Sequence, residues 1–76
     1  MTLCDVAVGE HVVLESCDLA PEHAAWISAI GLAAGESLQV LQRAPAGGPI
    51  HVRLEGGVEL AVARDVARAL VVVKRP

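Results

Sequence analysis

Ile30 to Leu54 has the sequence IGLAAGESLQVLQRAPAGGPIHVRL, and the order of its glycines, prolines and apolar residues decides the fold. Gly31 suits the left-handed position that ends a helix, because glycine has no Cβ to clash there. Gly35-Glu36 predicts a turn into a strand over residues 37–43. In that strand Leu38, Val40 and Gln42 are expected on one face.

A loop and a second strand follow. Proline lacks a donor for a β-ladder and glycine weakens a strand, so the next six residues are predicted to form a loop. They are Ala44, Pro45, Ala46, Gly47, Gly48 and Pro49. Residues 50–54 then alternate as a strand again.

The same reasoning applied outward completes the chain. It predicts further strands over residues 10–16, 58–63 and 70–74, a helix over 21–30 and a helical turn within 64–69. The expected fold is all-β, with five antiparallel strands forming one small barrel. One helix lies between the first two strands, and a short helical turn precedes the last strand. Residues 1–76 are expected to form a single domain.

Composition restricts both the location and the core. Hydrophobic residues make up 54% of the chain but aromatic residues only 1%, so the core must be aliphatic. No apolar run approaches the roughly 20 residues of a membrane span, and the amino terminus lacks the pattern of a signal peptide. We therefore expect a cytoplasmic protein without membrane insertion, in which Cys4 and Cys17 are reduced.

Charge is distributed unevenly along the chain. Residues 1–42 carry six acidic residues and no lysine or arginine, whereas residues 43–76 carry six basic and three acidic ones. The formal net charge is −3. A net-acidic domain with a single aromatic side chain available for base stacking is a poor nucleic-acid binder, so no nucleic-acid partner is expected.

Catalysis and a local metal site are both disfavoured. There is no phosphate-binding loop, no nucleophile elbow and no catalytic carboxylate pair, and a small barrel fills its interior with its own side chains. No enzymatic activity and no required cofactor are expected. The metal-ligand candidates Cys4, Cys17, His11 and His23 lack chelating spacing, so metal is expected only as an adventitious or bridging ion between two molecules.

The sequence pattern of residues 30–54 resembles that of the FeoA family, small bacterial domains that accompany the FeoB ferrous-iron transporter. The resemblance extends to Leu3–Glu10 and Ala67–Val72. The resemblance implies a five-stranded barrel of the SH3 type. It also implies a non-enzymatic binding module that docks on the cytoplasmic part of an FeoB-like membrane transporter.

Trp26 departs from the family pattern, in which the position before the first apolar anchor of the helix, here Ile27, is often basic. Trp26 is interpreted either as an anchor in a partner interface or as a core residue over the barrel opening. The partner surface is predicted to combine Trp26 with Ala44, Pro45, Gly47, Gly48 and Pro49.

Two alternatives stay open. One is the carboxy-terminal SH3-like domain of an iron-dependent regulator of the DtxR type, against which stand the start at Met1 and the missing winged-helix domain. The other is a metal-bridged homodimer that acts as a metal sensor.

Overall fold

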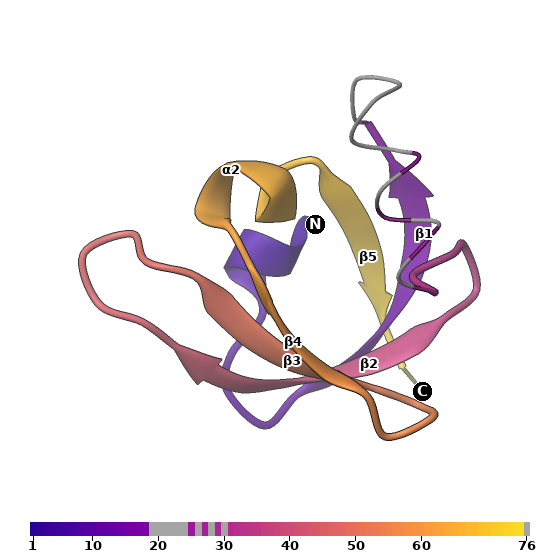
Figure 1. Cartoon of the computed structure of the whole chain (residues 1–76), viewed down its shortest axis with the longest axis horizontal. Helices are drawn as coiled ribbons and strands as arrows, with labels where there is room; N and C mark the ends of the chain where they lie inside the picture. The colour runs from indigo at the N-terminus through magenta and orange to yellow at the C-terminus, as the bar shows by residue number, and fades with distance from the viewer. Residues whose placement is uncertain (19–24, 26, 28, 30, 76) are drawn as a thin grey trace.

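Five antiparallel strands form a single sheet in the computed structural model, which describes residues 1–18, 25, 27, 29 and 31–75 (Figure 1). The strands are β1 (His11–Cys17), β2 (Ser37–Arg43), β3 (Ile50–Leu54), β4 (Glu59–Val62) and β5 (Leu70–Lys74). Their order across the sheet is β4-β3-β2-β1-β5. Each predicted strand is therefore present, with bounds that agree to within one residue.

Two short helical elements lie on the concave side of the curved sheet (Figure 1). They are the 3-10 helix η1 (Leu3–Asp5) and the helix α2 (Arg64–Ala67), and η1 contacts both α2 and β5. The predicted helical turn before the last strand is confirmed as α2. In the described part of the chain, η1 and α2 are the helical elements with defined bounds.

The helix predicted over residues 21–30 is not matched by a bounded element, and most of that prediction lies outside the described residues. Ala25, Ile27 and Ala29 are described and have helical conformation. Gly31 has the predicted positive φ, 90°. The Leu32 amide donates to the Ile27 carbonyl at 3.1 Å, the six-residue bond of a Schellman motif. This local evidence supports a helix end at Gly31.

The core formed by the described residues is aliphatic, as composition predicts. Every buried residue among those described is apolar. They are Leu3, Val6, Val12, Leu14, Ile27, Leu32, Leu38, Val40, Ile50, Val52, Leu54, Val62, Ala67, Leu70 and Val72. Side chains from all five strands, η1 and α2 meet in this core. They fill the space on the concave side of the sheet. In the described part of the chain, no helix is long and apolar enough to cross a bilayer.

The predicted inward position of Gln42 is wrong. The pairing of β2 with β3 shifts register between Val40 and Gln42, which places an extra residue in the strand. Because side chains alternate with a period of two, one added residue moves the next side chain to the other face. Gln42 is accordingly exposed.

Candidate functional site

The loop between β2 and β3 is a tight, hydrogen-bonded turn. Ala46 and Gly47 both have positive φ, 58° and 76°. The Gly48 amide donates to the Pro45 carbonyl at 3.1 Å, and the Ala44 amide donates to the Pro49 carbonyl at 3.1 Å. Two successive positive φ values are typical of turns whose twist matches the flanking strands. The loop is therefore a continuation of the hairpin.

Arg64 at the start of α2 bonds this loop to the rest of the molecule. Its Nε donates to the Gly48 carbonyl at 3.1 Å, and its Nη2 donates to the Ala44 carbonyl at 3.2 Å. All three residues are half-buried, whereas Pro45, Ala46, Gly47 and Pro49 are exposed. The loop is thus tethered at its base and presents its tip to solvent.

Trp26, the other predicted partner-binding residue, lies outside the described residues. The structure places neither its side chain nor its distance from the loop. Its role in an interface stays a prediction.

The predicted metal ligands are separated. His11 is exposed at the start of β1 and Cys17 is exposed at its end, six residues or about 20 Å along the strand. Cys4 is half-buried against the core and its Sγ donates to the Arg64 carbonyl at 3.6 Å. His23 lies outside the described residues.

Within the described ranges, no group of three or more His, Cys, Asp or Glu side chains could bind one ion. Both cysteines are free thiols. Desolvation raises the pKa of the Cys17 thiol, which disfavours the thiolate that would bind a metal.

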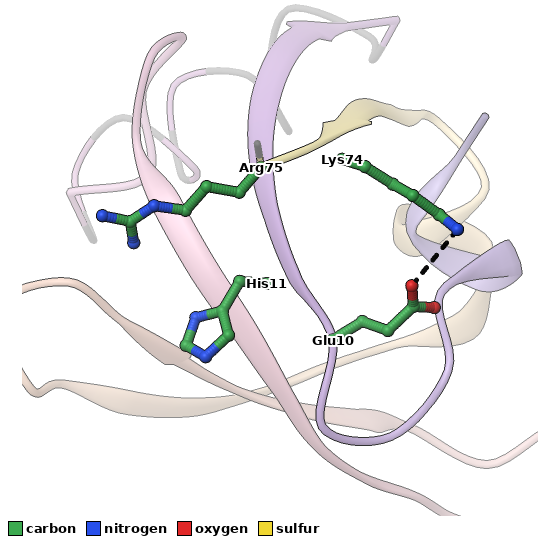
Figure 2. A pocket seen from close by; sticks show the side chains of 4 residues that line it. All are labelled: Glu10, His11, Lys74 and Arg75. Carbon is green, nitrogen blue, oxygen red and sulfur yellow. Dashed lines mark ion pairs between the residues drawn. The ribbon is translucent and has the colours of Figure 1, made fainter.

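Sequence reasoning missed a crevice at the ends of β1 and β5. Glu10, His11, Lys74 and Arg75 line it, and its volume is about 390 Å³ (Figure 2). Lys74 Nζ lies 3.4 Å from Glu10 Oε2, and the Ala7 amide donates to Glu10 Oε1 at 2.9 Å. The backbone bond from Ala7, aided by Lys74, lowers the pKa of Glu10. The two adjacent basic residues Lys74 and Arg75 were the only hint of this crevice in the sequence. They lie beside Glu10 and His11 because β5 pairs with β1, which the sequence does not reveal.

A family model, the FeoA domain, matches residues 1–74. The chain belongs to the FeoA family. No match is found among curated proteins.

Solved structures agree with this assignment. FeoA from Chlorobium tepidum superimposes with a TM-score of 0.90 at 29% identity, covering 100% of this chain and 71% of that one. A zinc complex of FeoA from Stenotrophomonas maltophilia, described as a prokaryotic SH3 domain protein, gives a TM-score of 0.79 at 27% identity. That match covers 96% of this chain and 89% of the other. The fold is therefore SH3-like, and the family is associated with ferrous-iron transport.

A manganese-dependent transcriptional repressor, in complex with manganese, has the same fold over part of its length. The TM-score is 0.91 at 24% identity, and the match covers 99% of this chain but only 36% of the repressor. The likeness is limited to the fold, because identity is low and most of the repressor has no counterpart here.

Proposed function

We propose that this FeoA domain is a non-catalytic, cytoplasmic accessory module of bacterial ferrous-iron uptake that docks on the cytoplasmic region of an FeoB-like transporter. Family membership supports the association with iron transport. The observation that carries the docking proposal is the exposed turn at residues 44–49, tethered at its base by Arg64.

A tethered turn is suited to docking because it loses little conformational freedom on binding. Its backbone bonds are already formed within the protein, and its tip consists of small or rigid residues: Pro45, Ala46, Gly47 and Pro49. The docked domain would alter the assembly or the nucleotide cycle of the transporter by binding one of its states more tightly than the others.

The chemistry of the described residues supports the non-catalytic part of this proposal. Among the described residues no polar or charged side chain is buried, so no group has the desolvated setting that shifts a catalytic pKa by several units.

Trp26 is assigned in this proposal to the centre of the interface, where truncating a tryptophan typically costs at least about 2 kcal/mol of binding. The experiment is a titration of the cytoplasmic region of an FeoB-like transporter with wild-type protein and Trp26→Ala, after circular dichroism shows that the variant is folded. Unchanged affinity would remove Trp26 from the interface and leave it as a core residue.

The loop has its own pair of variants. Ala46→Asp introduces a charge at the tip, where an aspartate tolerates positive φ, and should weaken binding about ten-fold or more. Gly56→Asp adds the same charge to the turn between β3 and β4 and should leave affinity unchanged. Failure of the wild-type protein to bind would refute the accessory role, whereas equal losses in both variants would refute only the assignment to the loop.

The metal-bridged homodimer is the second candidate, because a related FeoA was solved with zinc. The separated positions of His11, Cys4 and Cys17 favour weak 1:1 binding of Fe²⁺ or Zn²⁺ in dilute solution. Calorimetry combined with size-exclusion chromatography tests this. Micromolar or tighter 1:1 binding would contradict the expectation, and dimerisation that depends on metal would favour the sensor.

A further inference from the structure

Arg43, the last residue of β2, lies on the concave face of the sheet, although simple alternation places it on the outer face. Leu38 and Val40 are buried, so regular alternation would put residue 43 on the opposite face from them. The register shift between Val40 and Gln42 adds one residue and pairs Arg43 with Ile50, which is fully buried. Residues directly opposite one another share a face, and a bulge re-aims the side chains that follow it. The bulge of β2 therefore turns Arg43 inward.

The inward side chain of Arg43 binds the amino-terminal segment. Its Nη1 donates to the carbonyl of Val6, the residue that caps η1 at its carboxyl end. Val6 is fully buried, and no other hydrogen bond to its carbonyl is present among the described residues. A buried carbonyl is costly to leave without a donor, and a bond from a charged donor is stronger than one from a neutral donor. Arg43 thus fixes the end of β2 to the end of η1.

Further contacts close a ring around the base of the turn between β2 and β3. From α2, the Arg64 side chain donates to the carbonyls of Ala44 and Gly48. From η1, Cys4 Sγ donates to the Arg64 carbonyl, and η1 and α2 lie side by side (Figure 1). Because Ala44 directly follows Arg43, the start of the turn is held from η1 by Arg43 and from α2 by Arg64.

The two helical elements in this ring are themselves fixed to the core and the sheet. Leu3 in η1 and Ala67 in α2 are fully buried. The residue before η1, Thr2, forms a bridge with Val71 in β5. The ring therefore connects the exposed turn to the interior of the molecule, and the hairpin alone does not determine where the tip of the turn lies.

We propose that Arg43 is a positioning residue that holds the turn at residues 44–49 in place for docking. This inference rests on the proposed function, which assigns that turn to the partner surface. Arg43 is half-buried and bonded to Val6, so it acts through the turn. A turn whose base is fixed loses less conformational freedom when it binds, which makes binding tighter.

The test measures backbone order in the whole protein by nuclear magnetic resonance relaxation. Arg43→Gln has a side chain too short to reach the Val6 carbonyl, and Arg43→Met removes the donor altogether. Each should lower the order parameters of the turn from the rigid value of about 0.85 to about 0.7 or below. The reporting amides belong to Ala44, Ala46, Gly47 and Gly48.

Two further variants separate positioning from other effects. Arg43→Lys keeps a charged donor on a long side chain and should leave the turn close to its wild-type order. Arg68→Gln removes the same charge from an exposed position after α2 and should also leave the turn unchanged. A residue that only stabilises the fold would lower the melting temperature without changing order in the native turn. The proposal is therefore overturned if both Arg43→Gln and Arg43→Met leave these order parameters unchanged, or if Arg68→Gln lowers them equally.

Titration of the cytoplasmic region of an FeoB-like transporter supplies the second readout. Arg43→Gln should weaken binding about five-fold, and Arg43→Lys and Arg68→Gln should bind as the wild type does. A looser turn with unchanged affinity would overturn the role of Arg43 in docking. If the wild-type protein does not bind at all, the proposed function is refuted, whereas the order parameters still decide whether Arg43 fixes the turn.

Discussion

Gly48→Ala is the substitution whose effect can be worked out most directly from the geometry of the loop. A Cβ at residue 48 would lie 2.7 Å from the Cβ of Ala44 and 3.2 Å from the carbonyl oxygen of Pro45. Carbon atoms in contact prefer about 3.5–4.0 Å, so the first distance must open by about 1 Å. Neither neighbour can rotate away, because a methyl group and a carbonyl are attached directly to the backbone.

The backbone around Gly48 also resists the required movement. Gly48 donates to the Pro45 carbonyl, and its own carbonyl accepts from Arg64. Overpacking of this kind costs about 1–3 kcal/mol. In a domain of this size each kcal/mol lowers the melting temperature by about 4–8 °C, so a decrease of about 4–24 °C is expected.

A matched control is available in the other hairpin turn. A Cβ at Gly56 would meet nothing within 4 Å, and the φ of Gly56 is outside the left-handed range. Gly56→Ala should therefore stay within about 0.5 kcal/mol of the wild type in thermal or urea denaturation followed by circular dichroism. Removing the Ala44 methyl in the double variant Ala44→Gly, Gly48→Ala should recover part of the loss. If Gly48→Ala is as stable as Gly56→Ala, the argument from the clash is refuted.

Three further substitutions test other parts of the structure. Arg64→Ala removes two half-buried hydrogen bonds to the loop and should cost about 2 kcal/mol in urea denaturation; a loss below about 0.5 kcal/mol would show that the loop is not tethered by this side chain. Gly31→Ala should cost about 1 kcal/mol, entirely from backbone strain at φ 90°, because its Cβ would meet nothing within 4 Å; an unchanged melting curve would contradict this. The pKa of Glu10 is lowered in the folded state, so its carboxylate stabilises the fold above the usual pKa of 4.5, and that contribution is lost as the pH falls through the lowered value. The stability difference between wild type and Glu10→Gln should thus shrink from pH 7 to pH 3, and a difference independent of pH would count against the bonds from Ala7 and Lys74.

Local signals in the sequence determined the strands. Alternating apolar residues and flanking glycines or prolines gave β2 and β3 with the bounds that the structure has, and the apolar run of residues 70–73 gave β5. The repeated Gly-Glu pair was equally informative, since Gly9 and Gly35 have nearly the same positive φ, 91° and 92°. These features depend on residues a few positions apart, which is why they can be predicted without knowledge of the fold.

The two β-bulges of the sheet could not be predicted from these local sequence patterns. Alternation predicts an inward Gln42, but the register of β2 against β3 shifts just before it. A second shift, between Leu14 and Ser16 in the pairing of β1 with β5, leaves Ser16 exposed. A bulge is a property of two paired strands, so neither strand's own sequence pattern contains it.

The candidate sites also combine features that the local sequence predicts with features that only the fold creates. The turn at residues 44–49 was predicted from its prolines and glycines, but its bonds to Arg64 join residues 16 and 20 positions apart in the chain. The crevice lined by Glu10, His11, Lys74 and Arg75, with its pair of Glu10 and Lys74, exists only because β5 lies beside β1. The sequence by itself determined which residues turn and which alternate, because backbone conformation is a local preference. Only the tertiary structure decided which charges meet, because strand order brings together side chains that no sequence spacing relates.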